Sequence, residues 1–316
     1  MPNRRFTVLD HMYPEAWASL SHSTDDEWFD NCFGTSNYWD LALAPHGHKS
    51  TTVIANRHSE RLVDWLRTVS HDVIVSREAG RWNGTALRQA FPRAKLVAFA
   101  SHWVEDENLK GFDVVFSSFP LMPERCRKLG VRCEYLPLAF GRKVLDLVSP
   151  PSERDIPVAF FGGLGNRIWK RGTDTMVDIA CGVKEFRWWG YKSGPLPQIL
   201  ETTYQGECWG RRYFELLMRT KICLNRHGEV ADGFGNNMRQ YEATGCGCCL
   251  VTDDPGELNG LCKPYRDAWD AIAIVRDLLG RGRYAESFGA FAQGHILANH
   301  CYENRVPRFL EVVENL

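Results

Sequence analysis

Short apolar runs alternate with helix-like segments along the first half of the chain. The runs at 6–10, 51–55, 72–76, 95–100 and 114–117 predict strands. Segments 59–69, 85–91 and 122–129 have helical spacing, and Gly130 suits the end of the third. Strands about twenty residues apart with helices between them predict βαβ units and a parallel sheet.

A polar segment rich in proline separates this half from a second α/β series. Residues 141–157 include Ser149-Pro-Pro-Ser and are the best linker in the chain. Further strands are expected at 158–161, 187–189, 222–224 and 248–252, and helices at 173–181, from about 237, at 268–279 and at 302–314. The fold class is therefore predicted to be α/β, with two Rossmann-like, doubly wound domains facing a central cleft. We expect the domains at 1–150 and 151–290, with 291–316 packing back toward the first.

Composition excludes several classes of protein. The formal charge of -1 and a pI near 6.8 give no basic footprint for nucleic acid. No apolar run approaches the ~20 residues of a membrane span, and the first residues lack the apolar region of a signal peptide. Peripheral membrane contact stays open. Eleven cysteines without framework spacing favour a reducing cytoplasm.

The segment 225–253 is the most informative part of the sequence. It predicts a polar loop, a short helix from Asn237, a Gly-Cys-Gly turn and a buried strand. A helix N-terminus leaves backbone N–H groups unpaired and attracts phosphate. Glu242 follows at a distance at which its carboxylate can accept hydrogen bonds from a ribose diol. Together these features predict a nucleoside-diphosphate site, although Glu242 could also serve only the helix dipole.

Cys246, Cys248 and Cys249 form the only cysteine cluster. Adjacent cysteines cannot all point at one ion, so we expect them to pack under the turn and predict no metal site. Asp253-Asp254 is interpreted as a loop and helix-start feature.

Basic and histidine side chains follow several predicted strands. The loop after 158–161 contains Gly163, Arg167, Lys170 and Arg171, which either contact a bound anion or form a solvated basic loop. Its glycine spacing does not match a Walker loop. His227, with Asn225 and Arg226, follows the strand at 222–224 and is expected to face the cleft. His102, Ser117 and Ser118, and His11 follow strands of the first half, where α/β proteins bind ligands; each could equally be structural.

Three segments resemble a known family of enzymes. Asn236-Asn-Met-Arg-Gln-Tyr-Glu-Ala-Thr-Gly-Cys-Gly247 with Leu250-Val-Thr-Asp253 resembles the donor-binding block of GT-B glycosyltransferases, most closely those of the bacterial spore-maturation and spore-coat type. Asp113-Val-Val-Phe-Ser-Ser-Phe-Pro120 with Glu134-Tyr-Leu-Pro-Leu-Ala-Phe140 resembles their N-terminal domain. His300-Cys-Tyr-Glu-Asn-Arg305 resembles their final motif, which usually has Thr where Cys301 stands.

The resemblance implies a glycosyltransferase that moves a sugar from a nucleotide-diphosphate sugar to an acceptor hydroxyl of a glycan, protein or small molecule. The first domain is then expected to bind the acceptor and the second the donor. The resemblance also implies a retaining, metal-independent reaction with no cofactor besides the donor substrate. The base, the sugar, the acceptor and the oligomeric state cannot be read from the sequence.

The resemblance also assigns roles to individual residues. Glu242 matches the glutamate that binds the donor ribose, and Asn237, Met238 and Arg239 match the helix start that faces the diphosphate. We expect catalytic roles for His102, Arg171 and Glu242. Gly163, Arg167, Lys170 and His227 complete the expected donor site.

Two departures from the family pattern concern the donor pocket. Many relatives have Glu-x7-Glu, but Phe234 stands where the first acid is expected. Glu229 and Asp232 are nearby acids without that spacing. The loop after Gly260 is short and could trim the rim of the pocket.

Two other functions remain open at this stage. A nucleotide-sugar epimerase or hydrolase on the same fold would release product without an acceptor. A non-catalytic protein of the spore coat or cell surface would bind nucleotide weakly or not at all. A dehydrogenase is disfavoured, because no Gly-x-Gly-x-x-Gly opens the first βαβ unit.

Overall fold

The computed structural model describes residues 3–10, 42–54, 62–165, 169–228, 234–235 and 237–316. These residues form two compact units. The first unit extends to Ala139 and also includes Tyr302–Leu316, and the second is Phe140–Cys301. The domain boundaries predicted at 150 and 290, the cleft between the domains and the assignment of acceptor and donor to them stay predictions.

The first unit is built on a parallel sheet. Its described strands have the order β2-β1-β3-β4-β5-β6, and every neighbouring pair is parallel. The strands are β1 (Arg5–Asp10), β2 (Lys49–Ile54), β3 (Val73–Ser76), β4 (Lys95–Phe99), β5 (Val114–Ser117) and β6 (Cys133–Tyr135). All four residues of β3 and of β5 are buried, as expected for strands covered on both faces.

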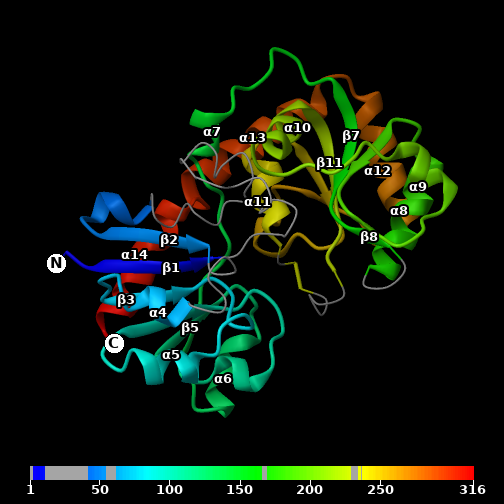
Figure 1. Cartoon of the computed structure of the whole chain (residues 1–316). Coiled ribbons are helices and arrows are strands. Elements are labelled where there is room, and N and C mark those ends of the chain that lie inside the picture. The colour runs from blue at the N-terminus through cyan, green and yellow to red at the C-terminus, as the bar shows by residue number, and fades with distance from the viewer. Residues whose placement is uncertain (1–2, 11–41, 55–61, 166–168, 229–233, 236) are drawn as a thin grey trace. The chain divides into compact units, whose positions relative to one another are not determined.

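Helices cover this sheet, and a C-terminal helix belongs to the same unit (Figure 1). The described helices are α4 (Leu62–Leu66), α5 (Gly84–Ala90), α6 (Met122–Lys128) and α14 (Tyr302–Glu314), with short 3-10 turns at Ala44–His46 and Asp106–Leu109. The ring of Phe309 on α14 lies 6.0, 6.1 and 5.1 Å from those of Phe6, Phe99 and Phe116. This aromatic cluster fixes α14 to the sheet.

The second unit has its own parallel sheet, with the described order β13-β12-β11-β7-β9. Its strands are β7 (Ile156–Phe161), β9 (Phe186–Trp189), β11 (Thr220–Asn225), β12 (Cys249–Thr252) and β13 (Lys263–Pro264). A separate pair consists of β8 (Leu164–Gly165) and β10 (Lys192–Ser193). From β7 the chain goes first to β9 on one side and then to β11 on the other. The strand order therefore reverses between β7 and β11.

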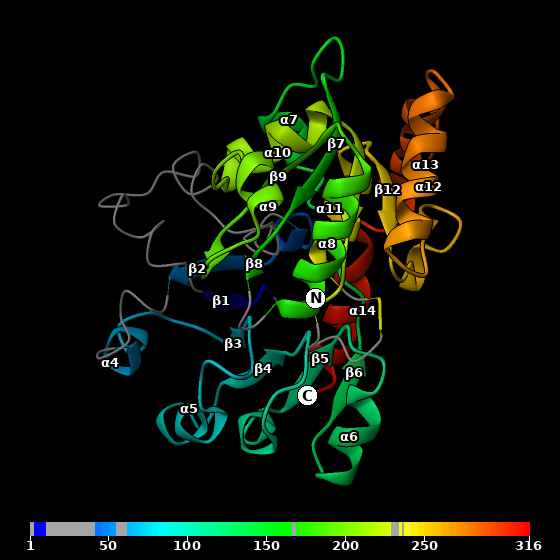
Figure 2. The same ribbon diagram turned by 90° about the vertical axis from the view of Figure 1, so that its right-hand side faces the viewer.

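Two layers of helices cover this second sheet (Figures 1 and 2). Helices α8 (Lys170–Gly182), α9 (Gln198–Thr203) and α12 (Ala268–Gly280) bury apolar side chains against Val158, Phe160, Ile222 and Leu224. Helices α10 (Gly210–Arg219), α11 (Met238–Gly245) and α13 (Tyr284–Asn299) lie on the other face. The chain also contains α7 (Val144–Leu147) within the predicted linker and a 3-10 turn at Gly256–Leu258.

Most described elements match the expectation, but two long helices were missed. Helix α10 was not predicted, although it buries Phe214, Leu217 and Met218. Helix α13 was also missed, because small residues such as Gly289 and Ala292 form its buried face and give it little apolar periodicity. Gly289 has no room for a side chain, since an added Cβ would lie 2.2 Å from the Gly247 carbonyl oxygen.

Candidate functional site

The reversal of strand order places a site at the carboxyl ends of β7 and β11. Ligands of open α/β sheets bind in the crevice at such a switch point, because the loops leave the two strands in opposite directions. Gly162 and Gly163 follow β7, and Asn225, Arg226 and His227 follow or end β11. Helix α11 begins beside these loops, as the contacts below show. Residues predicted from two separate motifs therefore meet at one end of the sheet.

Asn225 connects the strand to the start of α11. Its side chain is fully buried, and Nδ2 donates to Thr252 Oγ1 at 3.0 Å. Oδ1 accepts hydrogen bonds from Asn237 Nδ2 at 3.0 Å and from Arg239 at 3.1 Å. Asn237 also caps α11, since its side chain accepts from the Gln240 N–H at 3.2 Å. The amide of Asn225 thus fixes the position of the helix start.

Arg239 lies in the first turn of α11 and reaches toward the loop after β7. Its guanidinium lies 5.2 Å from the centre of the Phe160 ring. An added Cβ at Gly162 would lie only 2.6 Å from the guanidinium, so glycine leaves the room that Arg239 occupies. Within the described part of the chain Arg239 forms no ion pair, and its Nε is buried without a hydrogen-bond partner. Its charge is therefore available to an anion.

Glu242 lies one turn further along α11 and is almost completely buried. Its Oε2 accepts a hydrogen bond from the Tyr213 hydroxyl at 2.8 Å, while Oε1 is buried with no partner among the described residues. Burial raises the pKa of Glu242 to about 7, against the opposing effects of the Tyr213 hydrogen bond and the charge of Arg239. A buried carboxylate oxygen without a donor is costly, so it marks a position where a ligand can supply one.

His227 is held by Asp253, the residue that directly follows strand β12. His227 Nδ1 lies 2.7 Å from Asp253 Oδ1, and the His227 backbone N–H donates to the same carboxylate at 3.1 Å. Arg226 also pairs with Asp253, at 3.4 Å. Burial favours the neutral acid, but the His227 hydrogen bond and the charges of His227 and Arg226 keep the Asp253 pKa below its usual value. With Nδ1 engaged, the buried and unpartnered Nε2 is the atom left for a ligand.

Gly163 is packed against an aromatic side chain. An added Cβ there would lie 2.5 Å from the Tyr191 ring, whose hydroxyl accepts a hydrogen bond from Trp169 Nε1 at 2.9 Å. Gly228, after β11, lies similarly close to the Trp169 ring. The two glycines let the loops after β7 and β11 approach these rings.

The predicted basic residues beyond Gly163 lie at the start of α8. Lys170 and Arg171 are exposed, and Lys170 pairs with Asp174 one turn along the helix, at 3.4 Å. Arg167 lies outside the described residues, as do Glu229 and Asp232. Phe234, where an acid was expected, is half-buried.

The predicted residues of the first unit lie at the carboxyl ends of its strands. His102 follows β4, with Nε2 3.9 Å from Glu78 Oε1. The Ser117 hydroxyl is used within the fold, since it donates to the Ala100 carbonyl oxygen at 2.5 Å and accepts from the Phe119 N–H at 3.0 Å. The buried Ser118 hydroxyl has no partner in the described structure. His11 lies outside the described residues.

The cysteine cluster is part of the core. Cys246, Cys248 and Cys249 are all buried, and burial raises the pKa of each thiol. Cys248 Sγ lies 3.1 Å from the Leu217 carbonyl oxygen on α10. Among the described residues, no three His, Cys, Asp or Glu side chains gather as a metal site would require.

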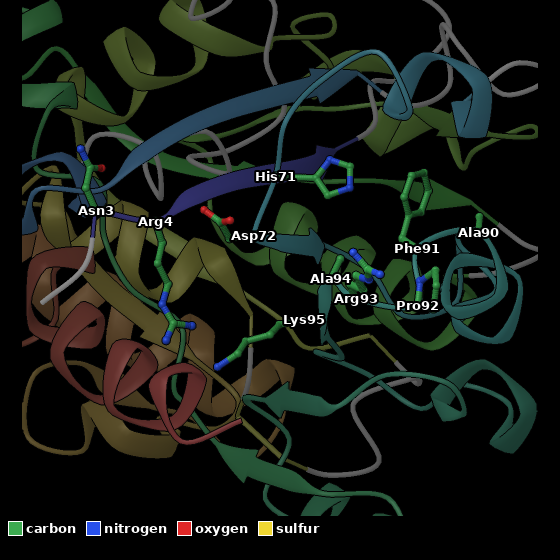
Figure 3. Close-up of a pocket in the computed structure, with 10 residues that line it drawn as sticks. All are labelled: Asn3, Arg4, His71, Asp72, Ala90, Phe91, Pro92, Arg93, Ala94 and Lys95. Carbon is green, nitrogen blue, oxygen red and sulfur yellow. The ribbon is translucent and has the colours of Figure 1, made fainter.

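A separate pocket of about 690 Å³ opens at the other end of the first sheet (Figure 3). It is lined by residues at the amino ends of β1, β3 and β4, including Arg4, His71, Asp72 and Lys95. Lys95 Nζ donates to the Val313 carbonyl oxygen at 2.9 Å, and Asp72 accepts from the Arg5 N–H at 2.9 Å. Its charged groups thus fix the last turn of α14 and the start of β1, and the pocket contains none of the predicted site residues.

Two residues at the site of the second unit were missed or misread from the sequence. Tyr213, which binds Glu242, comes from the unpredicted helix α10, and the contact joins positions 29 apart. Asp253 was read as a loop feature, but it orients His227. No local pattern signals either pairing, because both form only when separate elements pack.

Comparison with known proteins shows which family and which fold this chain is similar to. The profile of the glycosyl transferase-like family matches residues 165–311, which contain most of the site. Sucrose-phosphate synthase from Thermosynechococcus elongatus superposes with a TM-score of 0.65 at 13% identity, covering 99% of both chains. The chain therefore has the GT-B fold, and its residues 165–311 are similar to the glycosyl transferase-like family.

Other solved structures share this fold. Anabaena HepE in complex with UDP and glucose has a TM-score of 0.63 at 13% identity, covering 99% of this chain and 100% of its own. A trehalose-6-phosphate structure from E. coli, bound with UDP-2-fluoro glucose, has a TM-score of 0.63 at 11% identity and 99% coverage of both chains. A search of curated proteins found no match. Within the described part of the chain, no helix is long and apolar enough to cross a membrane.

Proposed function

We propose that this glycosyltransferase moves a sugar from a nucleotide-diphosphate sugar to an acceptor hydroxyl, with the donor held at the carboxyl ends of β7 and β11. The observation that carries the proposal is Glu242: its Oε1 is buried, has no partner among the described residues and lies one turn from a helix N-terminus. A ribose diol supplies the hydroxyl donors that this oxygen lacks, and the helix start supplies N–H groups for phosphate.

The diphosphate is the group best matched to the positive side of the site. Arg239, in the first turn of α11, forms no ion pair with any residue that the structure describes, and the N–H groups of that turn have the polarity that favours an anion. His227 adds a nitrogen, Nε2, on a ring whose orientation Asp253 fixes. Arg239 and His227 are thus proposed to stabilise the charge that develops on the leaving diphosphate. The same role is proposed for Arg167, Lys170 and Arg171.

The transfer is proposed to retain the anomeric configuration and to need no metal. Retention follows from the family resemblance alone. Metal independence is supported by the cationic side chains and helix N–H groups, which can offset leaving-group charge. The departing phosphate then takes the proton of the acceptor hydroxyl. His102 is proposed to act near the donor sugar, and the nucleotide sugar is a substrate rather than a cofactor.

The acceptor is proposed to be a glycan, protein or small molecule with a free hydroxyl, bound by the first unit. The resemblance to spore-coat type enzymes makes a surface polymer a reasonable class to test. A cytoplasmic location is proposed from the eleven cysteines of the sequence.

Nucleotide binding is the first test. A thermal-shift panel of UDP, GDP, ADP, TDP and CMP should contain at least one ligand that raises the melting temperature by several degrees, since ligand at 100 times its Kd adds about 2.7 kcal/mol. UDP is the first choice because two structures of the same fold contain it. Glu242→Ala should abolish the shift, whereas Glu311→Ala, an exposed carboxylate on α14, should not. If no nucleotide moves the transition, the donor site is wrong.

Product analysis separates the proposal from its alternatives. Incubation with a nucleotide sugar and a hydroxylated acceptor should release nucleoside diphosphate and yield a glycosylated acceptor. Equal release of free sugar without acceptor would indicate a hydrolase. An epimerised donor would indicate an epimerase. Binding without turnover would indicate the non-catalytic alternative.

A further inference from the structure

The hydroxyl of Tyr213 is the only described group that binds the carboxylate of Glu242. It donates to Oε2 at 2.8 Å and leaves Oε1 free. The two residues come from different helices, α10 and α11; Glu242 is almost completely buried and Tyr213 is half-buried. A carboxylate fixed through one oxygen presents its other oxygen in a defined direction.

The ring of Tyr213 is itself held in place by aromatic neighbours. It meets Phe161 of β7 edge to face at 5.5 Å, and Phe161 stacks on Trp189 of β9 at 5.3 Å. Desolvation in the packed layers raises the pKa of Tyr213 well above its usual value, so its phenol stays a hydrogen-bond donor. The position of the hydroxyl is thus set by contact with the sheet as well as by helix α10.

Few charged or titratable groups act on Glu242. Arg239 on its own helix and Tyr213 on α10 favour the ionised carboxylate. Cys223 of β11 and Cys246 after α11 also interact with it, but burial raises the pKa of both thiols well above the usual value, and they stay neutral. The balance between burial, Tyr213 and Arg239 therefore decides the charge of Glu242.

We propose that Tyr213 is a positioning residue for the donor: it keeps Glu242 ionised and aims its free oxygen at the ribose diol, so that nucleotide binding strengthens as pH rises through neutrality. This inference rests on the proposed ribose-binding role of Glu242. The ionised carboxylate accepts hydrogen bonds from both hydroxyls of a diol, whereas the protonated acid has lost part of that capacity.

The pH dependence has a defined sign. With a Glu242 pKa of about 7, most of the protein carries a neutral acid at pH 6 and a carboxylate at pH 8. Affinity for UDP should increase by about tenfold between these two values, as the ionised fraction does. Loss of the Tyr213 hydroxyl removes a hydrogen bond to the charged form, so the rise should occur at higher pH.

The test is the Kd of UDP, or of whichever nucleotide the panel selects, measured calorimetrically from pH 6 to pH 9 for four proteins. Tyr213→Phe should bind on the order of tenfold more weakly than wild type at pH 6 and approach it at pH 9. Tyr204→Phe is the matched control, since its hydroxyl donates to the Gly190 carbonyl oxygen at 3.0 Å and not to Glu242. Glu242→Gln has no titrating carboxyl at this position, so the pH dependence of its Kd reports the titration of the nucleotide phosphates alone.

The possible results distinguish a failure of the positioning role of Tyr213 from a failure of the proposed donor site. If Tyr213→Phe and Tyr204→Phe share the wild-type pH profile, the positioning role is overturned while the donor site stands. A uniform loss of affinity at every pH in Tyr213→Phe also overturns it, because that result indicates only a packing defect. If wild type binds no nucleotide at any pH, or Glu242→Gln binds as tightly as wild type, the proposed function itself fails.

Discussion

His227 Nδ1 lies 2.7 Å from Asp253 Oδ1, and this contact joins the ends of β11 and β12. The carboxylate fixes the ring so that Nε2 is the nitrogen left for a ligand. The same carboxylate accepts the His227 backbone N–H and pairs with Arg226. One side chain thus stabilises the loop and orients a site residue, so its replacement should affect both stability and binding.

Asp253→Asn should destabilise the protein in a pH-dependent way. The folded-state pKa of Asp253 is below its usual value, so its stabilising effect is present above the unfolded-state pKa near 3.8 and is lost as pH falls through the folded-state value. We expect a loss of about 1–3 kcal/mol at pH 7 and a much smaller one near pH 3. Urea unfolding at both pH values measures the difference; an equal loss at both would contradict the linkage.

Glu242→Gln should stabilise the protein while weakening donor binding. The folded-state pKa of about 7 exceeds the unfolded-state value near 4.5, so the folded protein holds a proton that the unfolded chain releases. Wild-type stability therefore decreases as pH rises from about 4.5 to 7, by on the order of 3 kcal/mol. The gain from Glu242→Gln should appear at pH 8 and be absent at pH 4.5. Melting curves without ligand at the two pH values test this. If Glu242→Gln also stabilised the protein at pH 4.5, the stabilisation would have a cause other than the raised pKa of Glu242.

Asn237→Ala and Asn83→Ala form a matched pair of helix-cap variants. Each asparagine caps a helix by accepting a backbone N–H, in α11 and α5 respectively. Each replacement should cost about 1 kcal/mol of stability. Only Asn237→Ala should also weaken nucleotide binding, because Asn237 joins Asn225 at the start of α11. Thermal-shift measurements with and without nucleotide compare the two variants. If nucleotide raised the melting temperature equally in both, the start of α11 would not be part of the nucleotide site.

Gly163→Ala should destabilise the protein through one steric conflict. The added Cβ would meet the Tyr191 ring at 2.5 Å, and moving that ring breaks its hydrogen bond with Trp169. A cost of about 1–3 kcal/mol is expected for overpacking. In a double-mutant cycle, Gly163→Ala should cost clearly less in a Tyr191→Ala background. Additive effects would show that the conflict lies elsewhere.

Much of the fold could be predicted because local patterns determine it. Strands with apolar runs, such as Val114–Ser117, and the helix Tyr302–Glu314 have the predicted bounds. Asn237 was expected at the start of a helix because asparagine can cap one, and the structure confirms it. Helix α13 could not be predicted, because its buried face consists of small residues and so lacks an apolar pattern. Gly289 on that face has to be small because it packs closely against the turn at Gly247.

The sequence by itself determined two parallel α/β series and a helix start followed by Glu242, since both depend on spacing along the chain. Only the tertiary structure decided what surrounds Glu242. Tyr213 reaches one oxygen from an unpredicted helix, and burial by the packed layers raises the carboxyl pKa to about 7. Hydrogen bonds between distant residues and the loss of solvent have no local signal, because both arise only when the helices close over the sheet.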